Sequence, residues 1–182
     1  MGQTPDQLIA MGYQARRDHR PEDAKRFFSE AVERCRASGS GDGSLLASAL
    51  IGLGQIERDL KNGLAALDNY REAVRLWRGK VDPLIFAHTF RHLGDILREE
   101  GVRDEARTCY EEALAIYRSH RETAPLDLAN TIRGYALLRG DSGDDAEEAA
   151  ALWREARGLY EAVNVEAGVK ESEAQIARLA AR

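Results

Sequence analysis

The sequence predicts an all-α fold, a right-handed solenoid of four helix pairs that a single C-terminal helix closes. Two observations lead to this prediction. A column of small residues recurs at steps of 42, 40 and 42 residues, at Gly12, Gly54, Gly94 and Ala136. Apolar residues in each copy follow the i, i+3, i+7 spacing of a helix, and no stretch alternates as a strand would. Because one helix pair cannot bury both of its apolar faces, we expect the copies to stack.

Each copy is expected to contain two amphipathic helices. The first helix carries the small-residue column, and the second carries an Ala–aromatic–Ala series such as Ala66, Tyr70 and Ala73. The aromatic members of the four series are Phe28, Tyr70, Tyr110 and Trp153. Glycine inside a helix costs about 1 kcal/mol relative to alanine. A glycine at position 54 therefore indicates that the partner helix approaches closely there.

We expect one domain over residues 1–182. Its repeats span about 4–38, 44–80, 84–121 and 126–162, and the closing helix spans 165–181. Pro83 and Pro125 suit the first turn of a helix. Ser38–Ser44, rich in Gly and Ser, is predicted to be the most flexible linker, and Gly140–Asp144 is predicted to be a turn. The closing helix is expected to use a thin apolar stripe, formed by Val169, Ile176 and Leu179.

The repeat pattern resembles the tetratricopeptide repeat family over about residues 4–162. A large apolar residue opens each pattern, at Leu8, Leu50, Phe90 and Ile132. The period exceeds the roughly 34 residues of that family, and is similar to the longer repeats of kinesin light chain. The usual tyrosine late in the first helix is replaced by Ala15, Glu57, Leu97 and Arg139. The resemblance implies a helical scaffold without catalytic activity that binds a partner protein or peptide.

Charge and composition exclude several other classes of function. The net charge is −5, from 26 basic and 31 acidic side chains, which argues against non-specific nucleic-acid binding. No apolar run approaches the roughly 20 residues that cross a bilayer, so no membrane contact is expected. The N-terminus lacks the features of a signal peptide, and we expect a cytoplasmic protein.

Motifs for catalysis are weak. Gly52-Leu-Gly54 begins like a dinucleotide-binding motif, but Glu57 occupies the place of its third glycine. His88 and His92 share a helix face with Asp95, a spacing that suits a divalent ion, yet half-exposed helix histidines are the favoured interpretation. We therefore predict no catalytic residue, no cofactor and no metal.

The resemblance places a partner-binding groove on the first helices. Its candidate residues are Tyr13, Arg16, Gln55, Arg58, His88, Arg91, Asp95, Arg98, Asn130 and Arg133. Arginines recur at equivalent positions of this set, and such a ladder favours a carboxylate or an acidic peptide segment. Local ion pairs are the alternative, because Asp95 lies four residues after Arg91 and three before Arg98.

Two further functions stay open. Apolar residues near Leu8 and Ile9, together with the closing helix, would allow self-assembly into a homodimer. A regulatory sensor of a small anionic ligand would use the same groove. The two-carboxylate clamp of chaperone-tail binders is excluded, because its positions hold Ile9, Tyr13, Gly52, His88 and His92.

Overall fold

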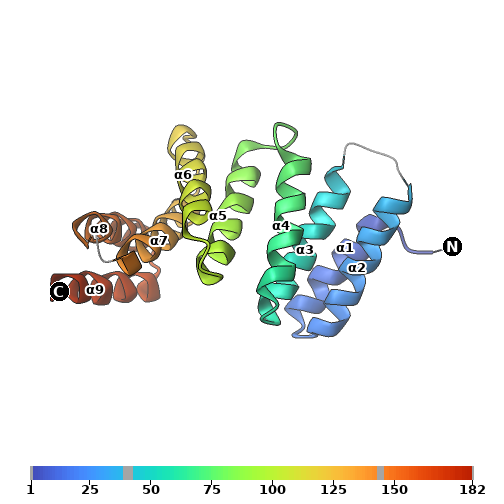
Figure 1. Ribbon diagram of the computed structural model, residues 1–182, viewed down its shortest axis with the longest axis horizontal. Coiled ribbons are helices and arrows are strands. Elements are labelled where there is room, and N and C mark those ends of the chain that lie inside the picture. Colours follow the sequence, from blue (N-terminus) through green and yellow to red (C-terminus); the bar gives the residue numbers. More distant parts are fainter. Residues whose placement is uncertain (1, 39–42, 143–145, 182) are drawn as a thin grey trace. The chain divides into compact units, whose positions relative to one another are not determined.

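The computed structural model describes residues 2–38, 43–142 and 146–181, and these residues form nine α-helices and no strand (Figure 1). The helices are α1 (Pro5–Arg17), α2 (Pro21–Ser38), α3 (Ser44–Asp59), α4 (Gly63–Trp77), α5 (Pro83–Glu99), α6 (Arg103–Ser119), α7 (Pro125–Ser142), α8 (Ala146–Ala162) and α9 (Glu166–Ala180). They group into two compact units, Met1–Asp82 and Pro83–Arg182, here called unit 1 and unit 2. The single domain over residues 1–182 stays a prediction.

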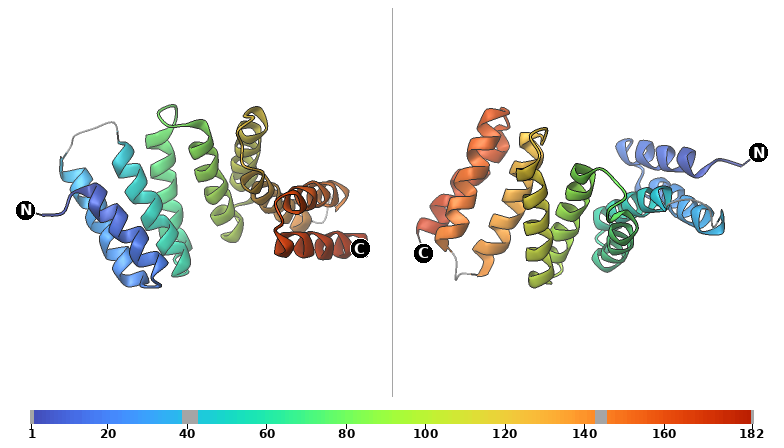
Figure 2. Two further views of the ribbon diagram at one scale, coloured as in Figure 1. Left: turned by 180° about the vertical axis from the view of Figure 1, so that it is seen from behind. Right: turned by 90° about the horizontal axis from the view of Figure 1, so that it is seen from above.

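Unit 1 contains two antiparallel helix pairs, α1 with α2 and α3 with α4 (Figure 2). Helix α3 packs against both helices of the first pair. The chain enters α1 through a capping box, in which the Gln7 N–H donates to Thr4 Oγ1 at 3.3 Å and the Thr4 N–H donates to Gln7 Oε1 at 2.9 Å. These bonds satisfy two N–H groups that would otherwise lack an acceptor at the helix start.

Unit 2 repeats this arrangement with α5 and α6, then α7 and α8, and adds α9 against α8. Pro83 and Pro125 begin α5 and α7 as predicted. The predicted turn at Gly140–Asp144 is wrong in its first part, because α7 continues through Ser142, and its remainder lies outside the described residues. The flexible linker predicted at Ser38–Ser44 also lies largely outside them, at residues 39–42.

Aromatic rings from the second helices pack against glycines of the first helices. A Cβ atom on Gly12 would lie 2.8 Å from the Phe28 ring, and one on Gly52 would lie 2.2 Å from the same ring. In unit 2 the Tyr110 ring occupies the equivalent place, 3.1 Å from a Cβ on Gly94 and 2.7 Å from one on Gly134. The glycines therefore make room for a fully buried aromatic side chain that joins successive pairs.

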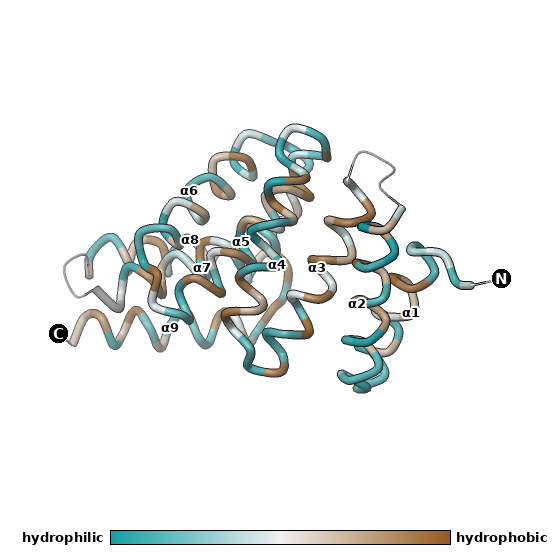
Figure 3. Tube along the Cα trace, turned by 45° about the vertical axis from the view of Figure 1, so that its right-hand side comes forward, coloured by the Kyte–Doolittle hydropathy of each residue, from teal (hydrophilic) through white to brown (hydrophobic). Residues whose placement is uncertain are grey.

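The predicted close approach of the second helix to Gly12, Gly54 and Gly94 is confirmed. The atoms that come closest belong to a side chain rather than to the helix backbone. The nearest atoms belong to an aromatic ring of the second helix, for example Tyr70 at 2.7 Å from a Cβ on Gly54. Apolar and polar stretches follow one another along every helix (Figure 3). In α1 and in the second helices this patterning buries one face and leaves the other in water, whereas α3, α5 and α7 are buried or half-buried along most of their length.

Helix α9 covers the end of unit 2 with Leu179 and Ile176 of the predicted stripe and with two small residues besides. Its buried residues are Gly168, Ser172 and Leu179, whereas Val169 is half-buried. A Cβ on Gly168 would lie 2.5 Å from the Tyr160 ring, so small residues set the closeness of α9 to α8. Leu179 joins the cluster around Trp153. The prediction missed Gly168 and Ser172 because it followed large apolar residues alone.

Candidate interaction surface on the first helices

The ten predicted groove residues divide between the two units. Tyr13, Arg16, Gln55 and Arg58 lie on α1 and α3 of unit 1, and the other six lie on α5 and α7 of unit 2. We call these surfaces the first-helix face of unit 1 and the first-helix face of unit 2. The second face also includes Glu171 of α9, which pairs with Arg133.

On unit 1, an ion pair joins the two first helices. Arg16 Nε of α1 donates to Asp59 Oδ2 of α3 at 2.8 Å, and Arg16 Nη1 donates to Gln55 Oε1 at 3.4 Å. The two charged side chains are 42% and 46% exposed, so the pair lies at the surface. A pocket of about 360 Å³ adjoins it, lined by Arg16, His19, Pro21, Ile56, Asp59 and Leu60.

Tyr13 belongs more to the core of unit 1 than to its surface. Its ring meets the Phe28 ring edge-on, with the centroids 5.0 Å apart. Burial raises the pKa of the Tyr13 hydroxyl, and the nearby Arg16 opposes that rise only in part. Leu8 is fully buried and Ile9 is half-buried. The premise of an exposed apolar surface around Leu8 is therefore wrong.

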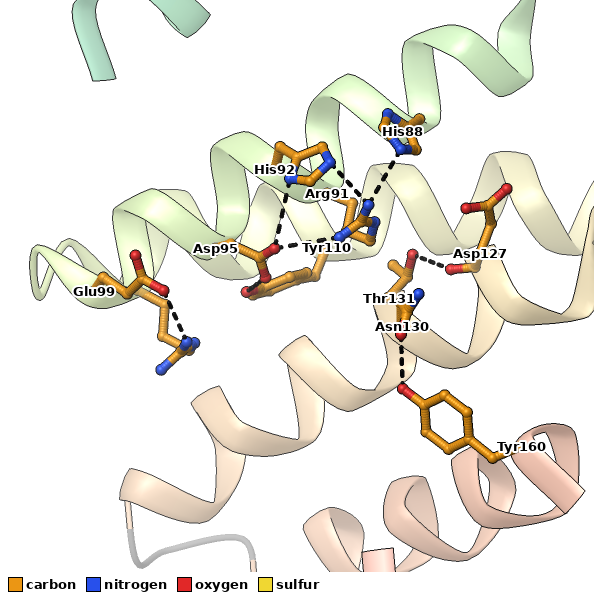
Figure 4. A network of polar contacts seen from close by, with 11 residues as sticks. His88, Arg91, His92, Asp95, Glu99, Tyr110, Asp127, Asn130, Thr131 and Tyr160 are labelled. Atoms are coloured by element: carbon orange, nitrogen blue, oxygen red, sulfur yellow. Dashed lines mark hydrogen bonds and ion pairs between the residues drawn. The ribbon is translucent and has the colours of Figure 1, made fainter. Parts of the chain in front are cut away.

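The first-helix face of unit 2 is organised around the guanidinium of Arg91 (Figure 4). Its Nη2 atom lies 3.2 Å from His88 Nε2 and 2.9 Å from His92 Nε2, and its Nη1 atom donates to Asp95 Oδ2 at 3.4 Å. The Arg91 side chain is only 11% exposed. Because a guanidinium can only donate, each of these contacts is a hydrogen bond only when the Nε2 atom accepts, that is, when the ring is neutral with its proton on Nδ1.

Asp95 connects this cluster to the second helix of its pair. The Tyr110 hydroxyl donates to Asp95 Oδ1 at 2.7 Å. Burial, together with the Asp95 carboxylate, raises the pKa of Tyr110 far above its usual value of 10.0. Tyr110 therefore stays a hydrogen-bond donor at any physiological pH. The same ring that fills the space between glycines also holds the carboxylate in place.

Helix α7 contributes two further polar side chains to this face. The Tyr160 hydroxyl donates to Asn130 Oδ1 at 2.8 Å, and burial raises the pKa of Tyr160 to about 12. Arg133 donates from Nε and Nη2 to the two carboxylate oxygens of Glu171, both at 2.7 Å. This bidentate pair joins α7 to α9 and raises the pKa of Arg133.

Arginines of the predicted ladder pair with carboxylates on both faces. Arg16 pairs with Asp59, Arg91 with Asp95, Arg98 with Glu99 and Arg133 with Glu171. Of the two local pairs that the sequence suggested for Asp95, the structure contains the one with Arg91. Arg98 instead approaches Glu99 at 3.6 Å. At neutral pH these faces therefore carry mixed charge.

The sequence analysis missed a buried ion pair in unit 1. Lys25 Nζ lies 2.9 Å from Glu57 Oε1, and Asn62 Nδ2 donates to Glu57 Oε2 at 2.8 Å. The Glu57 side chain is only 8% exposed. Two features of the sequence could have revealed this pair. Glu57 stands in a column that is apolar in the first and third copies, and a lysine lies in the preceding helix.

Within the described residues, no cluster of three or more His, Cys, Asp or Glu side chains is arranged to hold a metal ion. His88 and His92, considered above as metal ligands, direct their Nε2 atoms at Arg91 instead. In the same part of the chain, no helix is both long and apolar enough to cross a membrane.

Two models of the tetratricopeptide repeat match the sequence, one at residues 7–79 and the other at residues 86–121. The chain belongs to the tetratricopeptide repeat family. The all-α helical repeat solenoid, with repeats like those of kinesin light chain, is thereby confirmed. No curated protein matches the sequence. Proteins built from tetratricopeptide repeats generally mediate protein–protein interactions.

Solved structures of other proteins share the fold. BtubC (BKLC) from P. vanneervenii is 23% identical over 90% of this chain and 67% of its own, with a TM-score of 0.78. One crystal structure of the Podosopora anserina putative kinesin light chain nearly identical TPR-like repeats is 14% identical over 98% and 87%, with a TM-score of 0.80. A second structure of those repeats, also 14% identical, covers 99% and 98% with a TM-score of 0.61. At these identities the likeness concerns the fold alone.

Proposed function

We propose that this tetratricopeptide repeat protein is a non-catalytic interaction module, and that a peptide segment of a partner protein binds to its first-helix faces. The observation that supports this is the contrast between the two sides of each first helix. One side is filled by glycines and aromatic rings, as at Gly52 and Phe28. The other side presents hydrogen-bonding groups that are held in place and half-exposed, as at Arg133 and Glu171.

Such groups are suited to recognition because their geometry is set before a partner arrives. Asn130 is oriented by Tyr160, and Arg16 is oriented by Asp59. A partner that binds them loses little side-chain entropy on ordering, and ordering each mobile side chain would otherwise cost about 0.5–1.5 kcal/mol. An acidic segment fits the arginines, provided that it replaces or bridges the carboxylates that pair with them now.

A peptide-display library selected on the whole immobilised chain tests the proposal. The selected peptide is then measured by calorimetry against a variant with Arg16→Ala and Arg133→Ala, one substitution on each face. We expect at least tenfold weaker binding, because a lost hydrogen bond to a charged group costs about 1.5–3 kcal/mol.

The second helices supply a matched control. Arg36 pairs with Glu72 at 2.7 Å between α2 and α4, and Arg118 pairs with Glu155 at 2.9 Å between α6 and α8. A variant with Arg36→Ala and Arg118→Ala removes the same kind of surface pair from the other layer of each unit. Equal loss of affinity in both variants, or selection of no peptide at all, would contradict the proposal.

A further inference from the structure

The contact of one arginine with two imidazoles depends on the protonation state of those imidazoles. The His88 and His92 rings lie 4.6 Å apart, and both Nε2 atoms face the same Nη2 atom of Arg91. A proton added to either Nε2 removes an acceptor and places a positive charge about 3 Å from the guanidinium. Both contacts are therefore hydrogen bonds only while both histidines are neutral.

Charged and titratable groups on α5, α6 and α7 surround this cluster, and α8 and α9 add one group each. On α5 they are Arg91, Asp95, Arg98 and Glu99; on α6, Tyr110 and Tyr117; on α7, Asp127 and Arg133; on α8, Tyr160; and on α9, Glu171. Three of these groups are arginines and four are carboxylates. With neutral histidines the set carries a charge of about −1, and with both protonated about +1, so protonation reverses its sign.

We propose that the first-helix face of unit 2 is a proton-dependent site for acidic peptide segments, in which protonation of His88 and His92 releases Arg91 and makes the face positive. This inference rests on the proposed function, since it names the partner chemistry and the control of the same surface. Asp95 Oδ2, 3.9 Å from His92 Nδ1, is placed to receive the new imidazolium while Arg91 turns toward a bound carboxylate.

The environment sets the pH at which the change occurs. Burial lowers the pKa of His88 below its usual 6.5, and Arg91 lowers it further, whereas Asp127 and Asp95 oppose the shift. The His88 side chain is therefore neutral at pH 7.5 and takes up its proton only at a pH below its usual 6.5. Aspartate side chains of a peptide, with an ordinary pKa of about 3.9, are still ionised there.

The first test needs no ligand. In the whole chain labelled with ¹⁵N, long-range ¹H–¹⁵N correlation of the histidine rings reports tautomer and protonation at each pH, and His88→Gln and His92→Gln assign the signals. At pH 7.5 we expect both rings to be neutral with the proton on Nδ1. A proton on Nε2 of either ring at pH 7.5 would overturn the proposal, whatever the peptide-selection experiment gives.

The second test measures binding of a blocked hexa-aspartate peptide at pH 7.5 and pH 5.0 at constant ionic strength. We expect at least tenfold tighter binding at pH 5.0, and a variant with His88→Gln and His92→Gln to lose most of that gain. Glutamine keeps a neutral acceptor for Arg91 at both pH values. The control His120→Gln changes a half-buried histidine that follows α6, outside both first-helix faces, and should keep the gain.

The outcomes separate the two proposals. An equal gain in the double histidine variant, or no gain in the native chain, would refute the proton-dependent site. Selected peptides that ignore Arg16 and Arg133 would refute the proposed function. If the double histidine variant loses the pH dependence but still binds the selected peptides at pH 7.5, both proposals hold. The response to acid is then located at the two histidines.

Discussion

The packing of Phe28 between two glycines makes Gly52→Ala the most informative test of the fold. A Cβ at position 52 would lie 2.2, 2.5 and 2.5 Å from three ring atoms of Phe28, well inside any van der Waals contact. The ring is fully buried, so it has no space into which it can move. Such overpacking costs about 1–3 kcal/mol. Because alanine improves helix propensity by about 1 kcal/mol, we expect a net destabilisation of up to about 2 kcal/mol.

Gly158→Ala is the matched control, because no atom lies within 4 Å of the Cβ that it would add. It lies within α8 and should stabilise the protein by about 0.5–1 kcal/mol through helix propensity alone. Urea denaturation followed by circular dichroism and by tryptophan fluorescence measures both variants. Trp77 reports on unit 1, which contains Gly52, and Trp153 reports on unit 2.

A double-mutant cycle identifies the cause of the effect. Phe28→Leu removes the ring atoms that a Cβ on position 52 would meet, so this substitution should be less costly in the Gly52→Ala background than in the native chain. Stabilisation by Gly52→Ala, or additive effects of the two substitutions, would refute the packing of Phe28 between α1 and α3.

Three further outcomes follow from the polar groups. Glu57→Ala deprives Lys25 and Asn62 of their acceptor and should destabilise unit 1 by about 1–2 kcal/mol in urea denaturation, since the half-exposed lysine can turn to water. Tyr160, with a pKa raised to about 12, should keep its proton up to about that pH in alkaline titrations followed by phenolate absorbance. The unfolded state loses this proton near pH 10, so the folded state binds more protons between pH 10 and 12. The free energy of unfolding should therefore fall as the pH rises from 10 to 12. His88 has a lowered pKa, so below pH 6.5 the folded state binds fewer protons than the unfolded state. The free energy of unfolding should therefore fall as the pH drops below 6.5. Thermal unfolding measured across pH should show a smaller fall in His88→Gln.

The helices and their order were predictable because their causes are local and repeated. Small residues at Gly12, Gly54 and Gly94 mark the contact with an aromatic side chain in each copy, and Pro83 and Pro125 mark two helix starts. A second glycine column was not predicted. This column has Gly52 in the second copy and Gly134 in the fourth. The equivalent residues are Ala10 in the first copy and His92 in the third, so only two of the four copies show the glycine.

The candidate site was less predictable, because its charges pair across the fold. The pair between Arg91 and Asp95 spans one helical turn, and sequence spacing suggested it. Arg16 pairs with Asp59 at a separation of 43 residues, and Arg133 pairs with Glu171 at 38. The repeat period brings these partners together, yet equivalent carboxylates pair differently: Asp59 pairs with Arg16 of another helix, whereas Glu99, at the same position of the next copy, pairs with the adjacent Arg98. Only the folded structure shows which of them is near enough.

The distribution of charge gives the physical reason for the proposed role of proton uptake in recognition. A peptide carboxylate that displaces Glu171 from Arg133 exchanges one ion pair for another, and exposed pairs contribute only about 0–1 kcal/mol. Such an exchange gives little net affinity at neutral pH. Two imidazolium groups beside Arg91 would attract an acidic peptide to this face, and no other arginine would have to give up its carboxylate partner. The cluster on α5 is therefore the part of this surface where an acidic segment would gain affinity that the existing ion pairs do not offset.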